Sequence, residues 1–237
     1  PFAAETVESN MDRSRLVNSL RSVLEYIQQN PAYVYGFWDK NEGILGATPE
    51  TLFRCNNCGL LETMACAGTK KINESESSLL SDPKELHEHD LVVQGISQSL
   101  SHYGKVTAGN LQLLKLPHLM HLMTPLSLQL QNRLPFQELV KALHPTPALG
   151  AYPKESGRQW LQEYQLHINR SRFGAPAGYF LPETMQSNCY VAIRNIQWKD
   201  GCMYIAAGCG VVAESQCDRE WAEINLKLNA IKKMLNL

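Results

Sequence analysis

The stretch DPKELHEH, residues 82–89, begins a strongly helical pattern. Apolar side chains recur at helical spacing from Leu86 to Leu100, so we expect an amphipathic helix over residues 82–102. Glu85 and Glu88 are three residues apart in this helix and therefore project from the same face. The first question that the sequence raises is what these two carboxylates do.

A second acidic pair has the same spacing. Glu220 and Glu223 lie in an amphipathic helix expected over residues 218–235, with Lys227 one turn further along that face. Taken alone, such a pair is usually a solvated surface. The functional alternative is that both helices point their carboxylates into one cleft, where the charges would repel unless a hard cation such as Mg²⁺ neutralised them. Spacing leaves both alternatives open.

The remaining pattern mixes helices and strands, and it is most simply explained by one α+β domain over residues 1–237. Further helices are expected over residues 11–29, 136–143 and 156–163. Strands are expected over residues 32–38, 43–47, 52–55, 60–65, 111–116, 178–181, 190–198 and 203–207. Loops are expected over residues 73–82 and 144–153.

Composition limits the class of protein. With 22 basic and 23 acidic residues, the formal net charge of −1 provides no general field for nucleic acid or an anionic membrane. The sequence has no apolar run of membrane-spanning length and no signal-peptide pattern. Seven scattered cysteines indicate reduced thiols, so we expect a cytoplasmic protein. The chain lacks an initiator Met, which suggests that it begins inside a longer protein.

Cys55 and Cys58 have the spacing of zinc ligands. No second CxxC or paired His follows at a suitable distance, so a plain hairpin turn is the better interpretation.

Three other features are weak signals on local grounds. Residues 206–210, AAGCG, leave a strand with two glycines whose backbone amides could approach an anion, although many strand ends carry glycine. Arg194 is expected within a strand, on the face opposite Ile193, and would form either a structural ion pair or a carboxylate contact. Glu50 ends GATPE, and loop glutamates are usually exposed.

Together these features fall into a known order. The chain resembles the chorismate-utilising enzymes, which include isochorismate synthase, salicylate synthase, anthranilate synthase component I and aminodeoxychorismate synthase component I. The resemblance runs from about residue 31 to the C-terminus and is carried by GATPETLF, ACAGT, DPKELHEH, HLMTPL, LHPTPALGAYP, FGAPAGY, VAIR, AAGCGVV and REWAEINLKL. It implies an α+β fold of two antiparallel β-sheets packed as a sandwich with helices outside.

The resemblance implies a magnesium site at the acidic pairs. Glu88 and Glu223 match the glutamates that ligate Mg²⁺, and Glu85 and Glu220 match flanking positions that act through water. The metal holds the ring carboxylate of chorismate, and Lys227 matches a lysine near that carboxylate.

The resemblance also implies a pocket for chorismate. Arg194 matches the arginine that grips the enolpyruvyl carboxylate. Further contacts with the substrate or the pocket wall are implied for Gly68, Thr69, His121, Gly208, Cys209 and Gly210.

Glu50 matches the general acid that protonates the departing C4 hydroxyl in isochorismate synthases. Hydroxide is a poor leaving group, so the reaction needs such an acid. Water attacks C2, activated in the family by a lysine in a K-x-V strand. No lysine precedes Lys40, and Lys40 does not match that position. We therefore expect the base, with the family's N-terminal segment, to be missing from this chain.

The motifs HLMTPL and LHPTPALGAYP favour the isochorismate and salicylate synthase branch. Phe173, beside Ile193 in the implied pocket, stands where relatives that eliminate pyruvate commonly carry tyrosine. The missing hydroxyl favours isochorismate as the product. Isochorismate would serve menaquinone or siderophore synthesis. The alternatives are a salicylate synthase, an amination enzyme with a glutaminase subunit as partner, or a catalytically incomplete chorismate-binding fragment.

Overall fold

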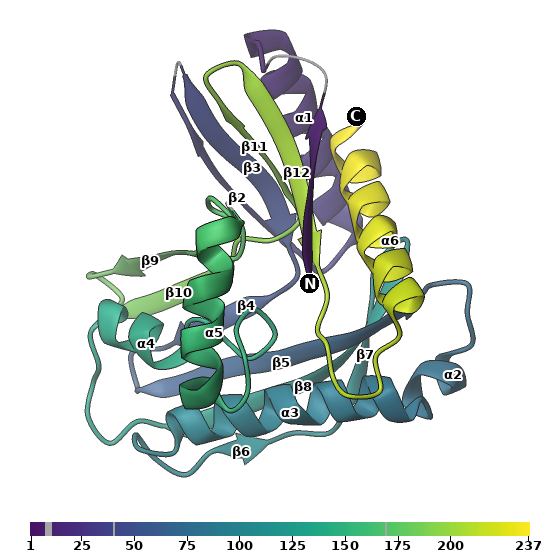
Figure 1. Ribbon diagram of the computed structural model, residues 1–237. Helices are drawn as coiled ribbons and strands as arrows, with labels where there is room; N and C mark the ends of the chain where they lie inside the picture. Colours follow the sequence, from purple (N-terminus) through teal and green to yellow (C-terminus); the bar gives the residue numbers. More distant parts are fainter. Residues whose placement is uncertain (8–10, 40, 169) are drawn as a thin grey trace.

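The computed structural model describes residues 1–7, 11–39, 41–168 and 170–237. Within them the chain forms two antiparallel sheets with helices on their outer faces (Figure 1), which confirms the expected α+β class. Lys40, which the sequence excluded as the base, lies outside the described residues. No helix in the described part of the chain is long and apolar enough to cross a membrane.

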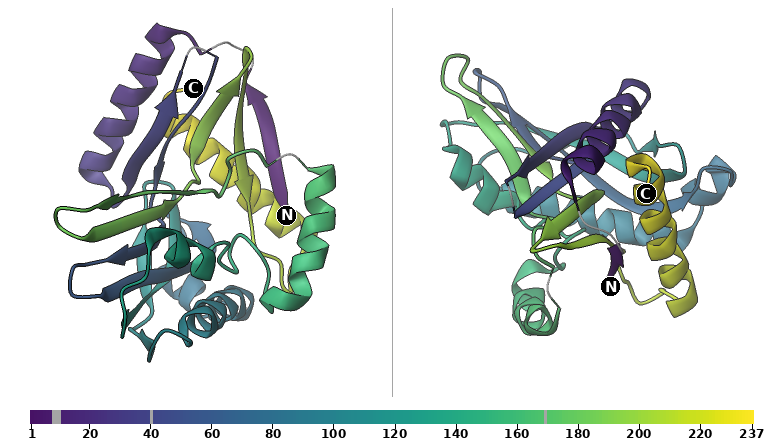
Figure 2. Two further views of the ribbon diagram at one scale, coloured as in Figure 1. Left: turned by 90° about the vertical axis from the view of Figure 1, so that its left-hand side faces the viewer. Right: turned by 90° about the horizontal axis from the view of Figure 1, so that it is seen from above.

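The first sheet has five strands in the order β1-β12-β11-β3-β2. Helices α1 and α6 pack against each other and against this sheet (Figure 2), around a core that includes Val23, Leu45, Ile205 and Ile224. The bounds are β1 Phe2–Val7, α1 Arg13–Gln29, β2 Tyr33–Trp38, β3 Glu42–Thr48, β11 Asn195–Lys199, β12 Cys202–Gly208 and α6 Cys217–Leu235.

The second sheet follows the order β6-β8-β5-β4-β10-β9, and β7 also pairs with β8. Helices α3 and α4 cover it, around a core that includes Phe53, Leu61, Ile96 and Leu139. The bounds are β4 Thr51–Cys55, β5 Leu60–Lys71, α2 Glu76–Leu80, α3 Pro83–Leu100, β6 Thr107–Ala108, β7 Gln112–Lys115, β8 Leu119–Gln129, α4 Phe136–Leu143, α5 Lys154–His167, β9 Pro176–Leu181 and β10 Gln186–Val191.

The strand expected over residues 190–198 is wrong as one element. The chain leaves the second sheet at the end of β10 and enters the first sheet at β11, so that residues 192–194 form the crossing. Arg194 has φ = 56°, a left-handed conformation that costs energy for any residue with a Cβ. The alternation argument for Arg194 and Ile193 therefore does not hold.

Other local predictions also need correction. The expected loop over residues 73–82 contains α2, capped by the Ser75 side chain, because a Ser-rich helix start looks like a polar loop. The sequence predicted no strand for β1 or for β8, where Pro125 argues against a strand inside a sheet. The turn before Gly59 is the predicted hairpin, with Cys58 exposed.

Candidate active site

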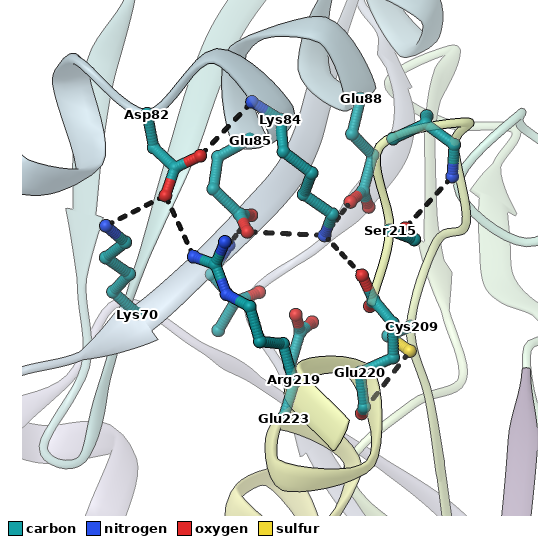
Figure 3. A network of polar contacts seen from close by, with 12 residues as sticks. Lys70, Asp82, Lys84, Glu85, Glu88, Cys209, Ser215, Arg219, Glu220 and Glu223 are labelled. Carbon is teal, nitrogen blue, oxygen red and sulfur yellow. Dashed lines mark hydrogen bonds and ion pairs between the residues drawn. The ribbon is translucent and has the colours of Figure 1, made fainter. Parts of the chain in front are cut away.

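Helices α3 and α6 bring the two acidic pairs together (Figure 3). The Nζ of Lys84 lies 3.2 Å from Oε1 of Glu85, 2.9 Å from Oε2 of Glu88 and 3.1 Å from Oε1 of Glu220. Glu85 and Glu220 are buried, so the solvated-surface alternative is wrong for them. We call Lys84, Glu85, Glu88, Glu220 and Glu223 the acidic cluster.

Asp82 fixes the spacing of the two helices. Its Oδ1 accepts a hydrogen bond from the backbone N–H of Lys84 (3.1 Å) and caps α3. Its Oδ2 lies 3.1 Å from Nζ of Lys70 on β5 and 3.0 Å from Nη2 of Arg219 on α6 (Figure 3). One carboxylate thus ties both acidic helices to the sheet below them.

The loop after β12 packs against the acidic cluster. The Nζ of Lys227 donates to the carbonyl of Gly208 (2.8 Å) and lies 2.7 Å from Oε1 of Glu223. The N–H of Cys209 donates to the carbonyl of Pro1 (3.1 Å). A Cβ at Gly210 would lie 2.2 Å from Oε1 of Glu88, so only glycine allows this close approach.

The charges of the cluster balance one another in part. Burial acts to lower the pKa of Lys84, but the carboxylates of Glu88 and Glu85 outweigh burial and raise that pKa. Lys84 is therefore an ammonium. Burial raises the pKa of Glu85. Although burial acts to raise the pKa of Glu220, the Lys84 ammonium beside its Oε1 helps to hold that pKa below the ordinary value.

Arg194 belongs to a second polar group that joins the first. Its Nη2 donates to Nε2 of His121 (2.6 Å), and Nδ1 of His121 lies 3.0 Å from Oγ1 of Thr69. A guanidinium can only donate, so Nε2 accepts and the ring is neutral with its proton on Nδ1. Burial and the charges of Arg194 and Lys227 lower the pKa of His121 well below its ordinary value, which agrees with a neutral ring.

Thr69 connects the two groups. Its backbone N–H donates to Oε2 of Glu85 (2.9 Å). Gly68 allows this contact because it forms a bulge in the pairing of β5 with β8, with φ = 76°. A continuous chain of polar contacts thus runs from Arg194 through His121 and Thr69 to the Glu85 carboxylate of the acidic cluster.

Buried polar side chains support the left-handed backbone at Arg194. The hydroxyl of Tyr35 donates to the carbonyl of Ile193 (2.7 Å). Nδ2 of Asn195 donates to the Tyr35 hydroxyl (2.8 Å) and to the carbonyl of Ala192 (2.9 Å). These bonds pair the two backbone carbonyls that immediately precede the arginine.

Replacing Asn195 by alanine is expected to lower the free energy of unfolding by about 1–3 kcal/mol. The buried Gln197 amide would lose the acceptor that Asn195 Oδ1 provides, and the Ala192 carbonyl would keep only its bond from the N–H of Gly174. Urea unfolding followed by circular dichroism measures this. Asn225→Ala is the matched control, since Asn225 is exposed on α6 and its side-chain amide donates to the carbonyl of Trp221 one turn earlier. Equal losses in the two variants would contradict the role of Asn195.

Glu50 lies at the junction of β3 and β4, with only 6% of its surface exposed. Its carbonyl accepts from the N–H of Val191 (3.1 Å), which fixes its backbone next to the crossing. Burial raises the pKa of the Glu50 carboxyl to about 7, an effect that Lys227 and Arg194 partly offset. The expectation of an exposed loop glutamate is therefore wrong, and Glu50 has the acidity of a general acid that works near neutral pH.

Phe173 and Ile193 lie at the edge of this network. The ring of Phe173 packs edge-on against Phe2, with centroids 5.2 Å apart, and under the guanidinium of Arg170. The side chain of Ile193 packs against the core of the second sheet. No polar contact described for Phe173 joins it to the acidic cluster.

Comparison with known proteins identifies the family. The family model described as "Chorismate binding enzyme" matches residues 4–236. This chain belongs to the chorismate-binding enzyme family. The sequence resemblance is thereby confirmed.

Named members of the chorismate-binding family are similar over most of the chain. The salicylate biosynthesis isochorismate synthase of Pseudomonas aeruginosa is 32% identical, covering 90% of this chain and 47% of that protein. Anthranilate synthase component 1 of Acetivibrio thermocellus is 31% identical, covering 97% of this chain and 47% of that protein. The chain thus spans about half the length of these relatives.

Solved structures agree on the fold. The putative 2,3-dihydroxybenzoate-specific isochorismate synthase DhbC of Bacillus anthracis has a TM-score of 0.83 at 25% identity, over 100% of this chain and 66% of that chain. The menaquinone-specific isochorismate synthase MenF of Escherichia coli has a TM-score of 0.81 at 24% identity, over 99% of this chain and 54% of that chain.

The magnesium ion implied by the chorismate-binding family fits the residues present. Among the described residues none gives a hydrogen bond to the buried Oε2 of Glu220, which leaves a carboxylate oxygen available for the outer role implied for Glu220. The absence of a side chain at Gly210 leaves room for the Glu88 carboxylate at this position. Within the described residues no three His, Cys, Asp or Glu side chains are already arranged around a metal position, and the Lys84 ammonium lies among the carboxylates instead.

Sequence reasoning missed Lys84, Asp82, Tyr35 and Asn195. Lys84 stands in the quoted motif, one residue before Glu85 and four before Glu88, a spacing that signals an ion pair along a helix. The contact of Tyr35 with residue 193 joins positions 158 residues apart, and no local pattern shows it.

Proposed function

We propose that this chain provides the chorismate site of an isochorismate synthase. The reaction adds water at C2 of chorismate and expels the C4 hydroxyl while the ring double bonds shift. The observation that carries this proposal is the buried Glu50 carboxyl, whose pKa of about 7 keeps a large share of it protonated at neutral pH. An acid in that state suits the expulsion of a hydroxyl group.

The charges of the site suit a substrate with two carboxylates. Arg194 offers a guanidinium at the sheet crossing for the enolpyruvyl carboxylate, with neutral His121 holding it in place. Glu88 and Glu223 would ligate Mg²⁺, with Glu85 and Glu220 as outer partners. The ion would supply positive charge for the ring carboxylate. Lys227, whose Nζ lies 2.7 Å from Oε1 of Glu223, would add a second positive charge.

In the proposed step Glu50 gives its proton to the departing C4 hydroxyl, which leaves as water. The attacking water places its hydroxyl on C2 and loses a proton to a base. In the family that base is a lysine, and no residue of this chain is proposed for the role. Glu50 recovers its proton from solvent before the next turnover.

The similarity to anthranilate synthase component 1 supports a second candidate, an amination enzyme working with a glutaminase subunit. Phe173 and the HLMTPL and LHPTPALGAYP motifs favour isochorismate instead. A salicylate synthase and an incomplete chorismate-binding fragment are the other outcomes that an assay can reveal.

A natural protein that contains residues 1–237 within a longer chain is expected to convert chorismate to isochorismate with Mg²⁺ and without an amine donor. Chromatographic separation of the products after incubation with chorismate checks this. Residues 1–237 alone are expected to show little or no turnover, and robust activity would show that the base lies within them. Anthranilate or aminodeoxychorismate on adding ammonia, or salicylate with pyruvate, would contradict the assignment.

A further inference from the structure

Lys84 occupies an unusual position for a lysine. Its ammonium contacts three carboxylates that come from two helices, and only 7% of its side chain is exposed. The contact with Glu220 bridges α3 to α6 and is not an ion pair along one helix. Lys227 is engaged separately with Glu223 and the Gly208 carbonyl.

The cluster carries more negative than positive charge. Its four carboxylates face two ammonium groups, those of Lys84 and Lys227, which formally leaves two negative charges. Four carboxylates this close would repel strongly without a cation among them. No described residue gives a hydrogen bond to Oε2 of Glu220. Lys84 therefore leaves at least one carboxylate oxygen of the cluster without a partner.

We propose that Lys84 is an internal counter-ion that occupies the acidic cluster when no metal is bound, and that a divalent cation must displace it from the carboxylates. This inference rests on the magnesium site of the proposed function. Lys84 thereby holds α3 and α6 together in the metal-free protein. It also competes with Mg²⁺. The apparent affinity for Mg²⁺ is proportional to the fraction of the protein whose carboxylates are free of Lys84, and Lys84 makes that fraction small.

Replacing Lys84 by methionine tests this, since methionine keeps the length of the side chain and removes the charge. Isothermal titration of the 237-residue chain with MgCl₂, in the absence of chorismate, is expected to give a dissociation constant about tenfold or more below that of the unmodified chain. The melting temperature without metal is expected to fall, and its rise on adding Mg²⁺ to grow. Lys141→Met is the matched control, because Lys141 pairs with Glu138 on the exposed face of α4.

The outcomes separate the two proposals. If the unmodified chain binds Mg²⁺ and Lys84→Met binds it no more tightly, the role of Lys84 is overturned and the metal site stands. If neither protein binds Mg²⁺, both are overturned. Should the variant not fold, acetylation of lysines in the unmodified chain, followed by mass spectrometry, decides. Mg²⁺ should speed the labelling of Lys84 several-fold and leave Lys141 unchanged, and an unchanged rate at Lys84 would overturn the proposal.

Discussion

In a longer protein that contains residues 1–237, replacing Glu50 by glutamine is expected to lower kcat for chorismate conversion by about 10²- to 10⁴-fold, with little change in KM. Glutamine has nearly the same shape but no proton to give to the leaving hydroxyl. The pKa of about 7 also predicts that kcat of the unmodified enzyme falls as the pH rises through 7, because the acid form of Glu50 is lost. Steady-state kinetics between pH 5.5 and 8.5 measure both effects.

Glu62→Gln is the control, since Glu62 is exposed on β5. A Glu50→Gln enzyme that keeps more than about a tenth of the activity would contradict the role of Glu50 as the acid.

The same substitution has a consequence for stability that needs no turnover. The pKa of Glu50 is raised from 4.5 to about 7 in the folded chain, so between these values the folded state binds more protons than the unfolded state. Stability is therefore lost as the pH rises through this window. At pH 8 the glutamine variant should be more stable than the unmodified chain by about 1–3 kcal/mol, and near pH 4.5 the difference should vanish. Urea unfolding at both pH values measures this, and a difference independent of pH would contradict the burial of a carboxylate.

The acidic pairs show how far sequence reasoning reaches. The spacing of Glu85 and Glu88 predicts a shared helical face, and the family resemblance predicts a partner pair on the last helix. Their burial depends on α3 and α6 meeting, which Asp82 and Lys84 bring about through contacts with Arg219 and Glu220. Those contacts join residues more than a hundred positions apart in the sequence, so no periodicity can reveal them.

The crossing at Arg194 shows where sequence reasoning fails. The segment from Tyr190 to Trp198 has the composition of one strand, and nothing local marks the change of sheet. The change is set by pairing, since β10 pairs with β4 and β11 pairs with β3. The family motif nevertheless predicts Arg194 as a site residue, because a motif carries the outcome of such long-range constraints.

Arg194 carries the second large prediction. Replacing Arg194 by glutamine is expected to weaken chorismate binding by about 10²- to 10³-fold, because a charge-assisted contact with a carboxylate would be lost in a buried site. Isothermal titration with chorismate measures this without turnover. Arg194→Lys should recover only part of the affinity, since an ammonium keeps the charge but lacks the planar fork that pairs with a carboxylate.

The matched control is Arg133→Gln, because Arg133 is exposed and contacts the carbonyl of Met185. The comparison of lysine with glutamine separates charge from geometry. If lysine restores full affinity, the site needs only a positive charge there, and the hydrogen bonds that fix the left-handed backbone at Arg194 serve folding alone. If lysine restores little, binding depends on the orientation of the guanidinium, which the hydrogen bonds of Tyr35, Asn195 and His121 fix together. The favourable binding would then offset the cost of the left-handed backbone conformation.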